Sequence, residues 1–225
     1  MSDRLNNDLV REQIMARLKA SGTEEVTLHQ AAPPAALDLD PDARLERLVE
    51  MMTAMRTDVH LVEGDSWLGK LKELARERGW KRFLYGPQGP LGGDLEMAWS
   101  SDAQALPELV AYTQPVEHIK ADLFEAMDAG ITSAKGGVAD TGAIVLWPTP
   151  EEPRLMSLVP PVHVAVLDAD TIYNSLAEMM VAEKWTEGMP TNALVISGPS
   201  KTADIEFTLV FGVHGPKELI VLIRK

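Results

Sequence analysis

Apolar residues recur along the chain with two spacings that alternate from one segment to the next. Spacings of three and four residues predict helices over residues 43–56, 66–78, 119–128, 170–182 and 203–211. Compact apolar runs predict strands over residues 59–62, 82–85, 131–138, 143–147, 163–167, 193–197 and 218–224. Strands that alternate with helices are typical of an α/β protein with a mostly parallel sheet covered on both faces.

Three of the strand-like runs are apolar at almost every position. They are HVAVL, ALVIS and LIVLI, which start at residues 163, 193 and 219. A strand that faces water on one side alternates apolar and polar residues, whereas a strand buried on both faces does not. We therefore expect all three strands at the centre of the sheet.

A separate amphipathic helix precedes this pattern and ends before Gly22. Its apolar residues at helical spacing are Leu5, Leu9, Val10, Ile14 and Leu18. Residues 30–41 are rich in proline and alanine, which predicts an extended linker. We therefore expect residues 1–41 to form a helix with its linker and residues 42–225 to form the α/β domain. Whether the helix packs on that domain or on another subunit stays open.

Composition narrows the range of partners. The chain of 225 residues has a formal net charge of −13, which argues against nucleic acid or an anionic membrane as a partner. No run of residues is long and apolar enough to span a bilayer, and residues 1–20 lack the core of a signal peptide. These features predict a cytoplasmic protein without membrane insertion.

The residue types also limit the chemistry of the chain. It has no cysteine, which excludes disulfides, a thiol nucleophile and an iron–sulfur cluster held by its own thiolates. Its five histidines show no metal-ligand spacing, so we predict no metal site. The dinucleotide fingerprint, the Walker A loop and the nucleophile elbow of α/β hydrolases are all absent.

One loop combines the features of a small anion site. Gly198-Pro199-Ser200-Lys201-Thr202 follows a predicted strand and precedes the predicted helix over residues 203–211. A tight turn, a lysine and free N–H groups at a helix N-terminus together can hold a carboxylate or a phosphate. The alternative is a capped strand–helix turn without a ligand, in which Asp204 and Glu206 complement the helix dipole.

Two further segments carry candidate polar groups. Asp140 stands in an Ala-Asp-Thr-Gly turn and would act as a general base, as an acceptor for a ligand hydroxyl, or as the cap of a hairpin. An aspartic protease needs two such carboxylates in an all-β protein, and the second is missing. Arg154 would clamp a carboxylate or pair with Glu151 or Glu152. His163 opens a strand and suits the core, whereas His214 stands in a tight turn and is the better functional histidine.

Three stretches together resemble the lactate utilization protein C family, which contains a LUD domain. They are ADTGAIVL, RLMSLVPPVHVAVL and SGPSKTADIEFTLVFGVHGPKELIVLI, in the order that the family shows. The resemblance is strong from Pro115 to the C-terminus and general before it. The family's motif positions correspond here to Asp140, Thr141, Gly142, Arg154, Pro160, His163, Gly198, Pro199, Ser200, Lys201, Thr202, Asp204, Glu206, His214, Gly215 and Pro216.

The resemblance implies a three-layer α/β/α sandwich like that of the NagB/RpiA/CoA-transferase group. It also implies a part in oxidising L-lactate to pyruvate, beside two partner proteins that carry iron–sulfur clusters. This chain would then be the non-redox component and would bind no cofactor itself. Whether it also forms a homo-oligomer stays open.

The resulting site hypothesis assigns two groups of residues. Asp140 and His214 would act on a hydroxyl or move a proton. The residues that would bind a small carboxylate or phosphate are Thr141, Gly142, Arg154, Gly198, Ser200, Lys201, Thr202 and Asp204. Two other functions remain open: a free-standing enzyme like a CoA-transferase or a sugar-phosphate isomerase, and a regulatory module that binds a small acid. Covalent CoA transfer needs a glutamate nucleophile, and the sequence shows none in a convincing glycine-rich setting.

Overall fold

The computed structural model describes residues 2–20, 37–102, 106–203, 209–212 and 214–225. It divides into two compact units, Met1–Ala35 and Ala36–Lys225. In the first unit, α1 (Ser2–Ala20) confirms the predicted helix around residues 5–18. Its apolar residues Val10, Ile14 and Met15 are exposed.

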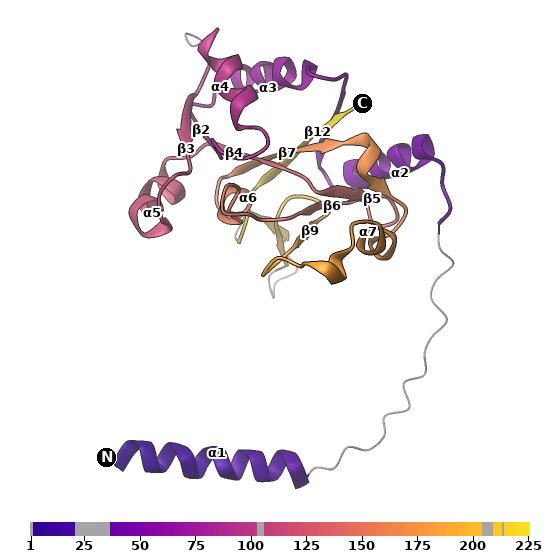
Figure 1. The fold of residues 1–225 in the computed structure, drawn as a ribbon. Helices are drawn as coiled ribbons and strands as arrows, with labels where there is room; N and C mark the ends of the chain where they lie inside the picture. Colours follow the sequence, from indigo (N-terminus) through magenta and orange to yellow (C-terminus); the bar gives the residue numbers. More distant parts are fainter. Residues whose placement is uncertain (1, 21–36, 103–105, 204–208, 213) are drawn as a thin grey trace. The chain divides into compact units, whose positions relative to one another are not determined.

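A six-stranded sheet forms the centre of the second unit (Figure 1). All neighbouring strands in it run parallel. Their order across the sheet is β1 (Asp58–Val62), β12 (Glu218–Arg224), β7 (Val162–Asp168), β4 (Ala129–Ser133), β2 (Arg82–Tyr85) and β3 (Glu108–Ala111). The predicted α/β class with a mostly parallel sheet is therefore confirmed.

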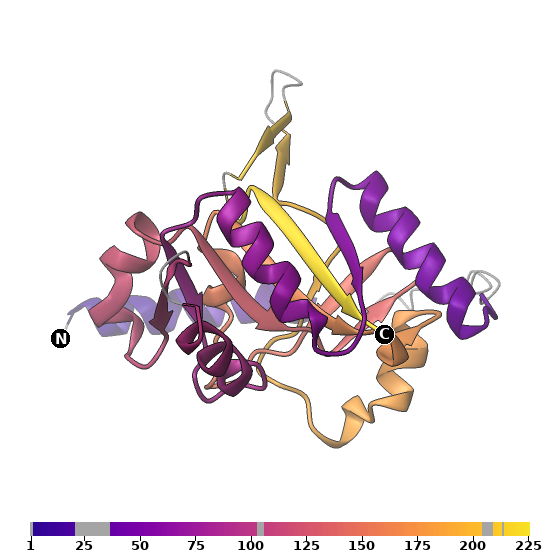
Figure 2. The same cartoon turned by 90° about the horizontal axis from the view of Figure 1, so that it is seen from above.

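A smaller, mixed sheet and a hairpin complete the strands. The smaller sheet has the order β8 (Ile172–Tyr173), β5 (Gly136–Val138), β6 (Ala143–Leu146) and β9 (Leu194–Ile196). The hairpin consists of β10 (Lys201–Ala203) and β11 (Leu209–Phe211), which pair antiparallel. Figure 2 shows these two strands projecting beyond the larger sheet.

Helices flank the two sheets, and two of those described begin at a residue whose side chain caps the helix. The flanking helices are α2 (Pro41–Ala54), α3 (Ser66–Glu77), α4 (Gly92–Ser100), α5 (Val116–Glu125), α6 (Leu155–Leu158) and α7 (Leu176–Ala182), with short 3-10 turns at Ala169–Thr171 and Trp185–Glu187. Asp40 accepts a hydrogen bond from Ala43 N at 2.9 Å and precedes a proline at the first helical position. Both features favour a helix start. Ser175 caps α7 in the same way, through Glu178 N.

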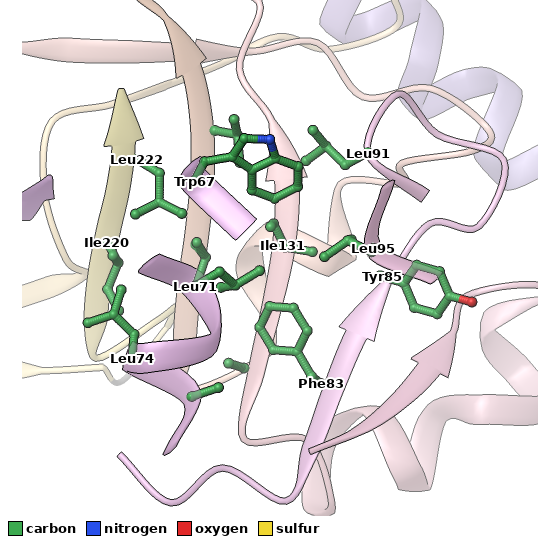
Figure 3. Packing of buried hydrophobic residues seen from close by; sticks show 14 of the residues in the cluster. Trp67, Leu71, Leu74, Phe83, Tyr85, Leu91, Leu95, Ile131, Ile220 and Leu222 are labelled. Carbon is green, nitrogen blue, oxygen red and sulfur yellow. The ribbon is translucent and has the colours of Figure 1, made fainter. Parts of the chain in front are cut away.

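Strands β7 and β12, which lie side by side inside the larger sheet, each bury both faces. Val164 and Val166 of β7 pack with α3 and α4 on one face, in a cluster that includes Trp67, Leu71 and Leu95 (Figure 3). The alternate residues Ala165 and Leu167 pack with α2 and with the smaller sheet on the other face. Strand β12 alternates in the same way, so the expected two-sided burial is confirmed for the runs at residues 163 and 219.

The third apolar run does not lie at the centre of the larger sheet. Its residues form β9, which is paired with β6 at the end of the smaller sheet, and the side chain of Val195 is 50% exposed. The expectation for this run was wrong. An edge strand and a central strand have the same local composition, because the position in the sheet depends on distant pairing partners.

The predicted helix over residues 203–211 is also wrong. Thr202 pairs with Val210 and Ala203 with Leu209, in the antiparallel ladder of β10 and β11. Nine residues give too short a run for the hydrophobic period to separate helix from strand. The β-branched and aromatic residues Thr202, Val210 and Phe211 favour strands, and this preference prevailed.

Other differences concern boundaries and elements that the pattern did not predict. Residues 131–138, expected as one strand, belong to β4 and β5 in two different sheets. The helix expected over residues 170–182 begins only at Leu176, after β8. Helix α4 and strand β3 were not predicted, since the glycine pair that starts α4 indicated a loop. Within the described ranges, no helix combines the length and apolar character that a membrane crossing needs.

Candidate functional site

A cavity of about 290 Å³ lies where the loop after β9 meets the turn before β12. The starts of β7 and β12 and the end of α6 also border the cavity. Its wall is formed by Ser157, Leu158, His163, Val195, Ile196, Ser197, Gly198, Pro199, Ser200, His214, Gly215, Pro216 and Leu219. Most of the described wall is apolar, and its polar side chains are serines and histidines.

Hydrogen bonds and close packing join the two loops at the cavity. Ser200 N donates to Pro216 O at 2.9 Å, and Gly212 N donates to Ser200 O at 3.0 Å. A Cβ atom added to Gly215 would lie 3.2 Å from Ser200 Cβ, so glycine permits this close approach. The segments 198–200 and 214–216 are thus held together, although more than ten residues separate them in the chain.

The Ala-Asp-Thr-Gly turn lies beside this pair of loops. Strands β6 and β9 are antiparallel and pair Ile144 with Ile196. If this register is continued by two residues on each strand, Gly142 stands opposite Gly198. Both glycines also pack against the end of α2, Gly142 against Met51 and Gly198 against Met55. Because Met51 and Met55 are one helical turn apart, α2 supports both segments at once.

Asp140 lies in this turn but not in the described wall of the cavity. Its backbone N donates to Asn174 O at 3.0 Å, which fixes the start of the turn. Its Oδ1 atom is buried and has no hydrogen-bond partner in the part of the chain that the structure describes. A buried carboxylate oxygen without a donor is uncommon and calls for an explanation such as a ligand or a catalytic role. Asp140 therefore stays a candidate, and its backbone contact with Asn174 lies on the β8 side of the smaller sheet rather than in the cavity wall.

Arg154 lies outside the cavity as well. Its exposed side chain precedes α6 and borders a void of only about 10 Å³ beside Ser157. Ser157, which lines both spaces, donates through Oγ to Arg154 O at 2.9 Å. Among the described residues, no ion pair joins Arg154 to Glu151 or Glu152. The alternative of a salt bridge is thus not seen among the described residues, and the role of Arg154 as a carboxylate clamp stays a prediction.

The helix N-terminus expected at Lys201 is not formed. Lys201 begins strand β10, and its exposed side chain reaches Met55 Sδ at 4.0 Å. The expected helix start was therefore wrong, because the N–H groups of a paired strand bond to the neighbouring strand. Binding of an anion by Ser200 and Lys201 stays a prediction. Asp204, Glu206 and the side chain of Thr202 lie outside the described part of the structure.

The two histidines in the cavity wall have different environments. His214 is exposed at its rim, and Gly215 and Pro216 follow it. His163 is 1% exposed, and its Nε2 lies 2.9 Å from Thr132 Oγ1. Burial lowers the pKa of His163 to about 3, so its imidazole is neutral at physiological pH. Within the described ranges, no three His, Asp or Glu side chains are grouped to hold a metal ion.

Glu152 is a buried acid that sequence reasoning treated only as a partner for Arg154. It is 7% exposed, and its Oε2 accepts from Ser133 N at 3.0 Å and from Ser133 Oγ at 2.6 Å. Its side chain packs on Gly89, where an added Cβ would lie 2.9 Å from Glu152 Cγ. No local pattern could reveal this contact, since Gly89 and Ser133 are distant from Glu152 in the chain.

We expect Glu152→Gln to stabilise the protein at neutral pH. Burial raises the pKa of the Glu152 carboxyl, although the two hydrogen bonds from Ser133 oppose the shift. The folded state then binds more protons than the unfolded chain above the ordinary pKa of 4.5, so stability falls as pH rises through that range. Glutamine keeps an oxygen acceptor for Ser133 and carries no charge.

Urea unfolding between pH 4 and pH 8 measures this effect. The advantage of Glu152→Gln should be present at pH 7 and should shrink as pH falls toward the ordinary pKa. Glu151→Gln serves as the control, because Glu151 has no hydrogen bond to Ser133 among the described contacts. A variant that is less stable than the wild type at pH 7 would contradict the expectation.

A larger hollow of about 600 Å³ lies at the carboxyl ends of β1, β7 and β12. Its charged residues are Asp42, Asp65, Asp168, Asp170, Arg224 and Lys225. Arg224 is already paired with Asp168 at 2.6 and 2.8 Å, so the remaining field is mostly negative. This charge disfavours a small acid, and we take the cavity at His214 as the candidate site.

Comparison with known proteins identifies relatives that span most of the chain. The LUD domain model matches residues 45–223. "Uncharacterized protein NMB1437" of Neisseria meningitidis is 36% identical over 217 residues, which cover 94% of this chain and 92% of that protein. "Lactate utilization protein C" of Deinococcus radiodurans is 36% identical over 112 residues, 48% of this chain and 50% of that protein. The match to the latter therefore spans only half of its length.

The fold has a counterpart among solved structures. The crystal structure of a DUF162 family protein from Deinococcus radiodurans superposes with a TM-score of 0.58 and covers 84% of this chain and 100% of that one. At 21% identity this likeness supports the fold alone. The LUD domain match over residues 45–223 and the near full-length similarity to NMB1437 show the family directly. The chain belongs to the LUD domain family.

Proposed function

We propose that this chain is the non-redox component of an L-lactate utilization system and binds a small 2-hydroxy or 2-oxo acid in the cavity at His214. The observation that carries the proposal is the convergence of segments 198–200 and 214–216 on one cavity. Relatives named "Lactate utilization protein C", such as that of Macrococcus caseolyticus at 38% identity over 96 residues, support the choice of acid.

The size and lining of the cavity suit such a ligand. Small-molecule sites in proteins have volumes of roughly 300–1,000 Å³ and a few polar groups on an apolar wall. At about 290 Å³ this cavity lies at the lower end of that range, which matches a ligand with few atoms. Ser200 and His214 can offer hydrogen bonds to a ligand, and Leu158, Val195 and Leu219 are among the apolar residues of the wall.

Local charge must overcome the negative field of the whole chain. The formal net charge is −13, so a carboxylate needs a nearby cationic or strongly donating group. His214 is exposed at the rim, where its ring can donate a hydrogen bond to a carboxylate. Asp140, whose buried Oδ1 has no hydrogen-bond partner among the described residues, is the group that we propose to accept a proton from the substrate hydroxyl.

Oxidation of lactate to pyruvate releases two electrons and two protons. The chain has no cysteine, so it cannot hold an iron–sulfur cluster through its own thiolates. We therefore propose that iron–sulfur partner proteins accept the electrons, and that this chain binds and orients the acid. The complex would act in the cytoplasm.

Replacing His214 by alanine should weaken binding of L-lactate by about 1.5–3 kcal/mol, the usual contribution of a hydrogen bond to a charged group. Isothermal titration calorimetry with L-lactate on the purified chain measures this loss. His118→Ala is the matched control, because His118 is an exposed histidine on α5, outside the cavity wall. Equal affinities of wild type and His214→Ala would contradict the placement of the ligand.

The role in a complex needs a separate experiment. The tagged chain would be purified from its native host grown on L-lactate and assayed for lactate-dependent dye reduction and for the visible spectrum of iron–sulfur clusters. A coloured complex that loses activity when this chain is removed would support the proposal. A colourless chain that turns over an acyl-CoA or a sugar phosphate alone would instead indicate a free-standing enzyme.

A further inference from the structure

The buried pair His163 and Thr132 is not explained by packing alone. His163 is the second residue of β7, and Thr132 lies on the adjacent parallel strand β4. Their side chains are 1% and 4% exposed, yet His163 also belongs to the wall of the cavity. A polar pair in the centre of a sheet is costly unless its groups are satisfied.

The hydrogen bond to Thr132 engages only one of the two ring nitrogens of His163. Nε2 of His163 lies 2.9 Å from Thr132 Oγ1, and this is the hydrogen bond that the described residues supply to the ring. A neutral imidazole has one donor and one acceptor nitrogen. Nδ1 therefore remains to bond with an occupant of the cavity. Leu219, which pairs with His163 across the strands, lines the cavity too and offers no polar group.

We propose that His163 contacts the C2 oxygen of the bound acid through Nδ1, and that Thr132 positions the ring through its hydrogen bond to Nε2. This inference rests on the proposed function and names the groups that determine its ligand class. The two histidines would divide the ligand between them: His214 at the rim meets the carboxylate, and His163 at the buried end meets the oxygen on C2. The pair thus favours 2-hydroxy and 2-oxo acids over simple carboxylic acids.

A neutral His163 suits a contact with the uncharged C2 oxygen of the ligand. Because complete burial disfavours the imidazolium, His163 offers the ligand a hydrogen bond without a full charge. A hydroxyl group both donates and accepts, so L-lactate can bond to Nδ1 in either tautomer. Propionate has the same carboxylate and carbon chain, but its C2 methylene does neither. A site built around a polar group rejects a ligand that leaves that group unpaired.

The test compares the dissociation constants of L-lactate and propionate by calorimetry or NMR titration. The wild type should prefer L-lactate by about tenfold or more, as loss of one buried hydrogen bond implies. His163→Phe replaces the imidazole by another aromatic ring, and it should bring the ratio close to one by weakening L-lactate far more than propionate. Thr132→Val should reduce the ratio, and Thr132→Ser, which retains the hydroxyl, should restore it.

Nitrogen NMR gives a readout that a purely structural role would not change. In the wild type, His163 should show the nitrogen shifts of a neutral imidazole, and its Nδ1 resonance should shift with L-lactate but not with propionate. If His163→Phe does not fold, as judged by circular dichroism, Thr132→Val decides the matter, because valine matches threonine in shape.

The outcomes separate the two proposals. A wild type that binds neither acid contradicts the proposed function, and this inference with it. A wild type that binds L-lactate, with a preference that survives in folded His163→Phe or in Thr132→Val, contradicts the inference alone. Loss of the preference with carboxylate binding retained supports both.

Discussion

Replacing Phe83 by alanine should lower the free energy of unfolding by about 3–5 kcal/mol, as expected for a large aromatic side chain removed from a packed core. Phe83 lies on β2, is fully buried, and points into the cluster with Leu71 and Leu95 (Figure 3). Its ring stacks between Trp80 at 5.5 Å and Trp99 at 6.0 Å. Alanine would remove both stacking contacts and leave a cavity that rigid strands cannot close.

Urea unfolding followed by tryptophan fluorescence and by circular dichroism checks this prediction. Two probes are needed, because the substitution itself changes the surroundings of two tryptophans. Phe124→Ala is the matched control, since Phe124 on α5 is 60% exposed and its loss should change stability by less than about 0.5 kcal/mol. A loss of less than about 1 kcal/mol in Phe83→Ala would show that the cluster can repack around the gap.

Replacing Gly142 by alanine should destabilise the protein by about 2–4 kcal/mol and weaken ligand binding as well. Gly142 has a φ of +59°, in the left-handed region that disfavours a Cβ atom. The added Cβ would also lie 2.2 Å from Met51 Cβ, so the turn or α2 must move. Because α2 also supports Gly198, this movement reaches the loop that lines the cavity.

Thermal unfolding and calorimetric titration with L-lactate measure the two effects of Gly142→Ala. Gly69→Ala is the control: Gly69 lies inside α3, and an added Cβ there meets no atom within 4 Å. That variant should gain about 0.5–1 kcal/mol, because alanine has the higher helix propensity. Met51→Ala should not rescue Gly142→Ala, since the close contacts are with Met51 Cβ and its backbone. Rescue would contradict the steric explanation.

The local hydrophobic pattern was enough to predict elements whose burial is typical of their composition. Strands β2 and β12 have the bounds that the apolar runs predict, 82–85 and 218–224. Residues 203–211 show where this reasoning fails. Their short amphipathic run fits a helix or a strand equally well, and the pairing of Thr202 with Val210 decided the outcome. Pairing partners several residues away do not appear in a local hydrophobic period.

The candidate site shows the same division between local and tertiary information. Tight turns at Gly198 and His214 are visible in the sequence, because glycine and proline mark turns wherever they occur. That these turns share one cavity depends on the bond from Ser200 N to Pro216 O, which only the folded chain forms. Glu152 was missed for a related reason. Its partner Ser133 ends β4, and the two residues meet only in the folded chain.

The sequence by itself determined the α/β class, most of the strands of the parallel sheet and the family resemblance. Each of these follows from hydrophobic periods or from short motifs, which act within a few residues. Tertiary structure alone decided that β9 is an edge strand, that β10 and β11 form a hairpin, and that His163 joins Thr132 at the cavity. The physical reason is that burial and hydrogen-bond partners are set by strand order and register, which bring together residues that are distant in the chain.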